Sequence, residues 1–172
     1  TSIALKERRA KLLQKIEKEA ELKSGTAAKL SSVELIRDDR KRWLLFRQQR
    51  GSWGVLKRKS SALFTDFLAK VDLVIAPTLL ITEATNVFWK YQKFSDFPYD
   101  KCEKSIDHIV SLPDEYVNEM QLYRESFKLG CMLDHSVYDM IYLVLARRNN
   151  ATLLTMDQRL VASAEKAGVN TA

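Results

Sequence analysis

The sequence predicts an α/β fold, in which a short parallel sheet is sandwiched between helices and preceded by a helical N-terminal extension. Residues 73–76 and 152–155 are short, continuous apolar runs, typical of strands that are buried on both faces. Helical patterns alternate with these runs, and this alternation favours a parallel sheet covered on both sides. Ligands bind such sheets beyond the carboxyl ends of the strands. Candidate functional residues are therefore expected just after each apolar run.

Local signals place the other elements along the chain. Pro77 ends the first clear strand, Thr78 can cap the next helix, and Gly130 is expected to break a helical pattern. The segment 43–59 begins with an apolar run at residues 43–46. The rest of it shows neither helical nor strand periodicity in its apolar residues, so the segment is interpreted as containing an atypical first strand. Helices are expected at residues 5–23, 26–36, 61–70, 78–91, 101–112, 114–129 and 136–148, and from Asp157 onward.

Composition bounds the class of protein. The chain has 172 residues, of which 46% are hydrophobic and 29% charged, so a mostly disordered chain is excluded. No apolar run approaches the roughly 20 residues that span a bilayer, and residues 1–20 contain no apolar core of a secretory signal. We therefore expect a cytoplasmic protein without a membrane partner. Cys102 and Cys131 form no CxxC motif, so buried, reduced cysteines are expected rather than a structural zinc site.

Charge divides the chain into two parts. Residues 1–60 carry 17 basic and 7 acidic side chains, giving +10, whereas residues 61–172 carry 11 and 15, giving −4. We assign residues 1–42 to a basic helical segment and residues 43–172 to the main domain. The basic segment could bind nucleic acid, lie against an acidic surface of its own domain, or be a solvated helix. Charge alone does not choose among these three.

Three acidic residues follow the predicted strands. Glu83 lies in the helix after the first strand, Asp139 in the first turn of an apolar helix, and Asp157 after the second strand. In a parallel sheet these positions converge at one edge, where clustered carboxylates favour a hard cation such as Mg²⁺ or Mn²⁺. Such an ion can activate water against a phosphodiester. Each acid also has a structural alternative: a capping box with Ser136 for Asp139, a helix-dipole contact for Asp157, and an exposed helix surface for Glu83.

Three segments resemble the motifs of a known family. Residues 74–87, 135–146 and 153–160 resemble, in order, the second, third and fourth motifs of PIN domains, particularly VapC-type ribonuclease toxins of toxin–antitoxin pairs. The resemblance covers roughly residues 60–170. It implies a PIN-like fold, RNA as the substrate, homodimers, and an endoribonuclease site in which Glu83, Asp139 and Asp157 bind Mg²⁺ or Mn²⁺. By the same resemblance, Thr155 would orient a carboxylate or water, and Asn86 would lie near the site.

One family motif is missing. The family begins with a strand that ends in an aspartate, but Arg47 stands at about that place in this sequence. A cation there should weaken divalent binding, so a catalytically impaired or self-blocked PIN-like module that binds protein or nucleic acid is the alternative. Residues 1–42 resemble an antitoxin segment, and Arg40 or Arg42 could pair with the acids and block the site. The alternatives for this segment are a packed helix pair and a DNA-binding element.

Other chemistry-bearing residues are given structural roles. His108 and His135 have no partner at the spacing of a metal site or a catalytic triad. The aromatic residues Trp89, Tyr91 and Phe94 are expected to pack in the core or in a dimer, in preference to stacking on bases. No Walker loop or GxGxxG motif is present, so nucleotide-cofactor chemistry is not supported.

Overall fold

A computed structural model describes residues 2–21, 45–47, 68, 70–94, 97–155 and 157–171. The predicted helix at 26–36 and most of the one at 61–70 lie outside these residues. The described elements are α1 (Ser2–Glu21), β1 (Leu45–Arg47), β2 (Leu73–Pro77), α4 (Leu79–Phe94), α5 (Tyr99–Val110), β3 (Glu115–Val117), the 3₁₀ helix η1 (Glu119–Gln121), α6 (Tyr123–Leu133), α7 (Val137–Arg148), β4 (Thr152–Leu153) and α8 (Gln158–Lys166).

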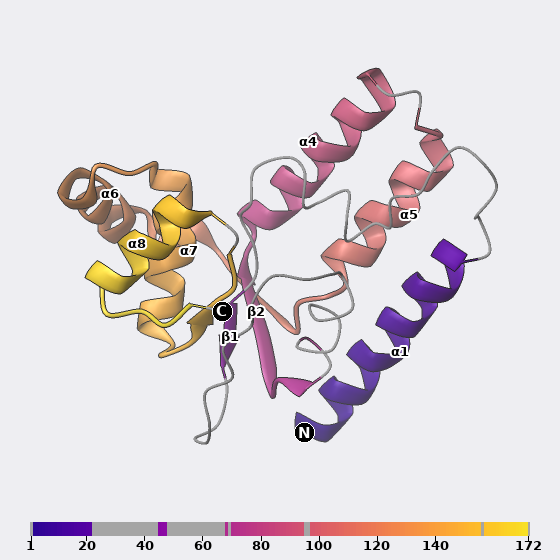
Figure 1. Cartoon of the computed structure of the whole chain (residues 1–172), viewed down its shortest axis with the longest axis horizontal. Helices are drawn as coiled ribbons and strands as arrows, with labels where there is room; N and C mark the ends of the chain where they lie inside the picture. Colours follow the sequence, from indigo (N-terminus) through magenta and orange to yellow (C-terminus); the bar gives the residue numbers. More distant parts are fainter. Residues whose placement is uncertain are drawn as a thin grey trace.

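These elements form a mixed α/β fold that is mostly helical (Figure 1). The described strands make one sheet in the order β3-β2-β1-β4. β2 and β3 are parallel, as predicted for this fold class, but β1 is antiparallel to both β2 and β4. The predicted short parallel sheet is therefore present only in the β2–β3 pair, and the pairing of β1 with its two neighbours differs from the prediction. Because β2 and β4 both run opposite to β1, their carboxyl ends still lie at the same edge of the sheet.

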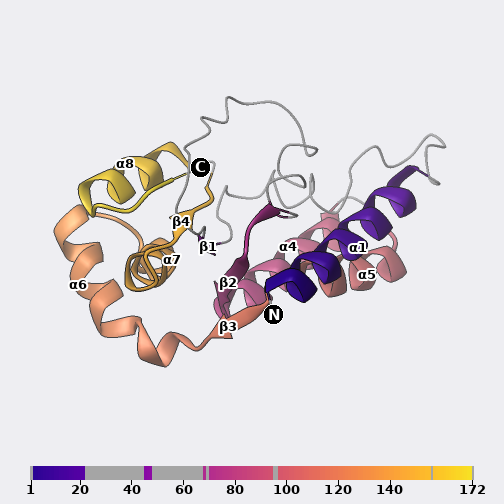
Figure 2. The ribbon, with the colours of Figure 1, turned by 90° about the horizontal axis from the view of Figure 1, so that it is seen from below.

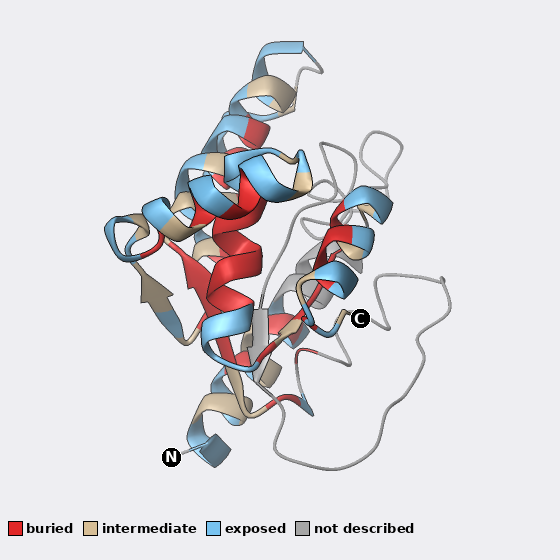
Figure 3. Cartoon of the chain, turned by 90° about the vertical axis from the view of Figure 1, so that its left-hand side faces the viewer, coloured by how far each residue is buried: buried red, intermediate tan, exposed pale blue. Residues whose placement is uncertain are grey.

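β2 separates two groups of helices. Val74 and Ala76 pack into a core with α1, α4 and α5, whereas Ile75 packs into a second core with α6, α7 and α8. Alternate side chains of a strand point to opposite faces, so a buried strand supplies both cores. Figure 2 shows the two groups of helices on opposite sides of the strands, and Figure 3 shows the buried residues gathered toward the middle of the described part of the chain. The layered arrangement agrees with the predicted sheet between helices.

The segment after α5 differs from its prediction. A helix was expected at residues 114–129, but β3, η1 and α6 occupy residues 115–133. Asp114 accepts a hydrogen bond from the Val74 backbone at 2.9 Å, which fixes the start of β3 beside β2. Glu119 accepts bonds from the Thr78 hydroxyl, at 2.6 Å, and from the backbone N–H of Leu79. Glu119 therefore caps the first turn of α4 from a distant part of the chain.

Two residues in α6 also differ from expectation. Gly130 does not break the helix but lies within α6 and is buried. A Cβ atom at Gly130 would lie 3.0 Å from the carbonyl oxygen of His135, so the glycine permits the close approach of the following turn. Cys102 is buried as expected, but Cys131 is exposed, so the prediction of two buried cysteines is wrong for Cys131.

The N-terminal helix α1 is anchored to the main domain by two arginines. The fully buried Arg9 donates hydrogen bonds to the Leu68 carbonyl at 3.0 Å and to the Val71 carbonyl, and forms an ion pair with Asp114. Arg8 forms a second ion pair with Asp114, at 2.8 Å. Part of the basic segment therefore does lie against an acidic residue of its own domain, which was one of the three interpretations of its charge.

Within the described residues, no single helix is long and apolar enough to cross a membrane. The helices α6 and α7 reach that length and composition only when they are taken together, across a bend of 112°.

Candidate functional site

Glu83 lies at the boundary between α4 and α7. It is half-buried in the second turn of α4. The hydroxyl of Tyr142, a fully buried residue of α7, donates a hydrogen bond to Glu83 Oε2 at 2.6 Å. A phenol that donates to a carboxylate makes a short, charge-assisted bond and fixes the orientation of the carboxylate. The alternative of a purely exposed surface position does not describe Glu83.

Asp139 lies in the first turn of α7, where only 4% of the residue is exposed. Ser136 is the N-cap of α7, but its side chain makes no capping hydrogen bond. The predicted alternative of a reciprocal capping box between Ser136 and Asp139 is therefore not formed. Instead, Oδ2 of Asp139 lies 3.2 Å from Nδ1 of His135, whose side chain is 7% exposed. Asp139 is thus an acidic side chain placed inside the protein beside an imidazole.

Tyr142 belongs to the same helix as Asp139, and its hydroxyl contacts Glu83 of α4. Tyr142 follows Asp139 by three residues, and residues three apart lie on the same face of a helix. Long side chains on a helix lean toward its N-terminus, which brings the Tyr142 phenol toward the turn that carries Asp139. Glu83 bonds to the end of that phenol. We infer that the structure brings Glu83 and Asp139 to the same boundary, from α4 and α7 respectively.

Asp157 has a clear local role at the start of α8. It is the N-cap residue, and its Oδ1 accepts hydrogen bonds from the backbone of Arg159 at 2.9 Å and of Leu160 at 3.4 Å. Thr155 is buried, and its hydroxyl oxygen accepts a bond from the Asp157 backbone at 3.1 Å. Both side chains therefore order the turn between β4 and α8. The predicted helix-dipole contact of Asp157 is present, as an N-cap.

The other predicted site residues either have only a position in the described structure or lie outside the described part of the chain. Asn86 is exposed on α4, one turn beyond Glu83. The backbone of Arg47 pairs with Leu73, at the edge where β2 begins and opposite to the edge from which α4 departs. Because β1 is antiparallel to β2, β1 ends at the edge of the sheet where β2 begins. A strand parallel to β2 would have ended at the opposite edge. Arg40 and Arg42, predicted to block the site, lie outside the described residues.

The three predicted acids are not gathered into one metal-binding group in the part of the chain that the structure describes. Within the described ranges, no group of three or more His, Cys, Asp and Glu side chains is placed to hold one ion. Mg²⁺ is bound in many proteins by one or two carboxylates, with water completing its shell. A two-carboxylate site made by Glu83 and Asp139 stays a prediction, whereas Asp157 has a carboxylate oxygen engaged in capping α8.

Two residues near the acids were missed by the sequence analysis. Tyr142 lies within the segment 135–146 that resembles a PIN motif, but no role was assigned to it, although its i, i+3 spacing from Asp139 was visible. His135 was considered isolated, yet it precedes Asp139 by four residues and lies against it. Its spacing was also visible, but His135 precedes the predicted helix, so a helical face could not be assumed. His108 is buried in α5, in agreement with the structural role predicted for it.

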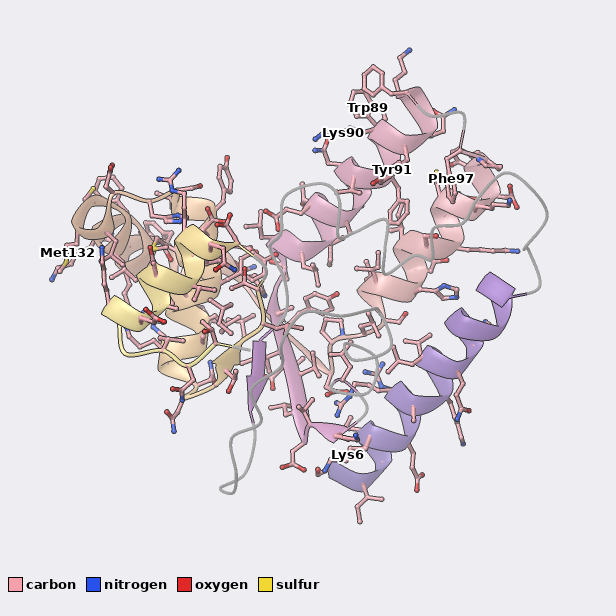
Figure 4. The ribbon with its side chains drawn as sticks, in the orientation of Figure 1. Lys6, Trp89, Lys90, Tyr91, Phe97 and Met132 are labelled. Atoms are coloured by element: carbon pink, nitrogen blue, oxygen red, sulfur yellow. The ribbon has the colours of Figure 1, made fainter. Side chains whose placement is uncertain are left out.

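The aromatic cluster lies at the end of α4 that is distant from the sheet (Figure 4). Tyr91 packs against the core and lies 6.5 Å from Phe97, between ring centroids, as predicted for a packing residue. Trp89 and Phe94 are 55% and 73% exposed and contact each other edge to face. Core packing is therefore confirmed for Tyr91; Trp89 and Phe94 do not pack in the core of this chain, and their packing in a dimer stays a prediction.

Comparison of the chain with models of known protein families, with curated proteins and with solved structures finds no match.

Proposed function

We propose that the chain is a divalent-metal-dependent endoribonuclease of the VapC type, which hydrolyses RNA phosphodiester bonds. The proposal rests on the three sequence motifs that resemble PIN domains and on one contact, the 2.6 Å hydrogen bond between Tyr142 and Glu83. That contact supports the proposal because it joins the second motif to the third. In this proposal, residues of two motifs that are joined by a contact across 59 positions contribute to one acidic site.

In this proposal, Glu83 and Asp139 would hold Mg²⁺ or Mn²⁺. Both are oxygen ligands of the kind that these hard cations prefer. When bound, the ion supplies an activated water and stabilises charge on the phosphodiester. The chain itself contributes orientation: Tyr142 holds the Glu83 carboxylate, and burial in α7 restricts the rotamers of Asp139. Asp157 and Thr155 support the site through the turn that they order before α8.

The test is cleavage of a labelled single-stranded RNA by the full chain in Mg²⁺ or Mn²⁺. Asp139→Asn keeps the size of the side chain but removes its charge, so the rate of cleavage should fall at least about 100-fold, as for removal of an essential catalytic group. Asp107→Asn is the matched control, because Asp107 is exposed on α5 and its change should leave the rate unaltered. Equal rates for both variants, or no cleavage by the unchanged chain in either metal, would overturn the proposal.

A second candidate is a catalytically impaired or self-blocked PIN-like module that binds RNA or protein without cleaving it. Two observations favour it: Arg47 stands where the first acidic motif is expected, and Asp157 has an oxygen engaged in a helix cap. The anchoring of α1 through Arg8 and Arg9 also shows that the basic segment contacts its own domain. RNA binding without cleavage, with no uptake of Mg²⁺ or Mn²⁺ by calorimetry, would favour this candidate.

Further parts of the proposal concern partners and location. An antitoxin partner, either a separate protein or residues 1–42 of this chain, a homodimeric assembly and a cytoplasmic location are all proposed from the family resemblance. Each can be examined on the full chain, by co-purification, by light scattering and by cell fractionation.

A further inference from the structure

The last turns of α4 carry two aromatic side chains that lie mainly in solvent. Trp89 and Phe94 are each more than half exposed, and they contact each other edge to face, with 6.0 Å between the ring centroids. Figure 4 shows Trp89 and the neighbouring Lys90 at the end of α4 that is distant from the sheet. Large apolar side chains that gather on a surface often mark an interaction site.

Charge indicates which class of partner fits this surface. Glu83 is the only acidic residue of α4, and the helix beyond it carries Lys90 and Lys93, of which Lys93 is exposed in the last turn. Exposed aromatic rings beside cations suit a strand of nucleic acid, whose bases stack on rings and whose phosphates are anionic. A second copy of the chain fits less well, because a two-fold contact would bring the same lysines together and lysine is depleted in interface cores.

The aromatic pair is aligned with the proposed acidic site. Lys90 follows Glu83 by seven residues and Phe94 follows Lys90 by four, so the three residues lie along one face of α4. At the rise of an α-helix, Trp89 lies about 9 Å and Phe94 about 16 Å beyond Glu83 along the helix axis. A strand of a few nucleotides covers such a distance. A strand held at the aromatic pair can therefore extend along α4 to Glu83.

We propose that Trp89, Lys93 and Phe94 form a stacking platform for single-stranded RNA, which leads the strand along α4 to the acidic site. Trp89 and Phe94 stack on unpaired bases, and Lys93 pairs with a phosphate. The two ring planes stand at 83° to each other, so each ring stacks on a different base. The inference rests on the proposed function for the identity of the ligand as RNA, but binding at the platform requires neither a metal ion nor cleavage.

The test is binding of a labelled single-stranded RNA to the full chain, measured by fluorescence anisotropy in EDTA so that a metal-dependent nuclease cannot act. Trp89→Ala should weaken binding at least about fivefold, as for the loss of one base-stacking contact, whereas Trp89→Phe keeps a ring and should retain most of the affinity. Phe127→Ala is the matched control, because Phe127 is 63% exposed on α6, which packs on the other face of β2. Duplex RNA should bind more weakly than the single strand, because its bases are already stacked.

The phosphate contact is tested separately, by the dependence of RNA affinity on salt. Lys93→Gln should reduce the slope of log affinity against log salt concentration by about 0.7, the contribution of one phosphate contact to a single strand. Lys128→Gln is the control, because Lys128 is exposed on α6. An unchanged slope in Lys93→Gln would overturn the assignment of Lys93 to a phosphate.

The outcomes separate this proposal from the nuclease. RNA binding that depends on Trp89, without cleavage in Mg²⁺ or Mn²⁺, supports the platform and contradicts the nuclease. Cleavage together with unchanged RNA affinity in Trp89→Ala supports the nuclease and overturns the platform, as does a wild-type chain that binds no RNA. A change from dimer to monomer in Trp89→Ala by light scattering, with unchanged RNA affinity, would assign the surface to a second copy instead. If Trp89→Ala does not fold, Phe94→Ala in the same measurements decides in the same way.

Discussion

Arg9 of α1 and Asp114, the residue before β3, form an ion pair that is closed to solvent: their side chains are 0% and 1% exposed. Burial lowers the pKa of the Arg9 guanidinium from its ordinary value, and the neighbouring Arg8 lowers it further. Asp114 also accepts a hydrogen bond from the Val74 backbone. One carboxylate therefore joins the N-terminal helix to the central strand of the fold.

Asp114→Asn should destabilise the protein strongly. The change removes the ion-pair partner of the buried Arg9 charge, and breaking a buried pair in this way costs about 3–5 kcal/mol. The loss is measured as a shift in the urea unfolding midpoint. Glu115→Gln is the control, because Glu115 is the exposed neighbour of Asp114 and its change should alter the free energy of unfolding by no more than about 0.5 kcal/mol.

A double-mutant cycle tests whether the cost arises from the pair. Removing both charges, in Arg9→Met with Asp114→Asn, should cost clearly less than the sum of the single changes, because no unpaired charge remains. Simple additivity would contradict a direct coupling between Arg9 and Asp114.

Glu125 provides a pH-dependent contribution to stability. Its carboxylate accepts hydrogen bonds from Arg147 and Arg148, and the Arg147 bond in particular lowers the pKa of Glu125 below its ordinary value of 4.5. A group whose pKa is depressed on folding stabilises the folded state above its unfolded pKa. This stabilisation is lost as the pH falls through the lower folded pKa.

Glu125→Gln should therefore lower the melting temperature at neutral pH, and the difference from the wild type should shrink as the pH falls below 4.5. The measurement is thermal unfolding followed by circular dichroism over that pH range. Glu165→Gln, which changes an exposed glutamate of α8, is the control. A difference that stays constant with pH would show that the contacts of Glu125 with the two arginines do not act through its charge.

Gly130→Ala should destabilise the turn between α6 and α7. The added methyl group would lie 3.0 Å from the backbone carbonyl oxygen of His135, which cannot move without shifting the turn. Overpacking of this kind costs about 1–3 kcal/mol. Lys128→Ala, an exposed position of the same helix, is the control. A Gly130→Ala variant as stable as the control would show that the turn relaxes freely.

Much of the fold could be predicted because its signals are local. β2 and β4 coincide with the apolar runs, and Pro77 ends β2 as expected. The predicted helices at 78–91 and 136–148 agree closely with α4 and α7, and Asp157 caps α8. In each case a few neighbouring residues are sufficient to determine the element.

The errors occur where distant contacts decide the structure. β3 is a three-residue strand of partly buried or exposed side chains, and it exists through pairing with β2, as in the pair Ile75 and Glu115. Its own residues carry no alternating pattern. The direction of β1 likewise depends on how the chain returns to the sheet, because an apolar run fits a parallel and an antiparallel neighbour equally well.

The sequence proposed residues for the candidate site but could not predict their contacts. The motifs identified Glu83 and Asp139, whereas the bond from Tyr142 and the proximity of His135 depend on the packing of α4 and α6 around α7. No sequence spacing connects Glu83 with Tyr142, which are 59 positions apart. The roles of these neighbours became visible only in the folded chain.

The two roles of Asp157 can be separated by two substitutions. Asparagine caps helices about as well as aspartate, so Asp157→Asn should change stability by less than about 0.5 kcal/mol, whereas Asp157→Ala should cost about 1 kcal/mol. Because the Oδ1 atom is engaged by the backbone of Arg159 and Leu160, we expect Asp157→Asn also to retain metal binding. Urea unfolding and calorimetric titration with Mn²⁺ measure the two effects. Lost Mn²⁺ binding in a fully stable Asp157→Asn would restore Asp157 as a third ligand, since only its charge would have changed.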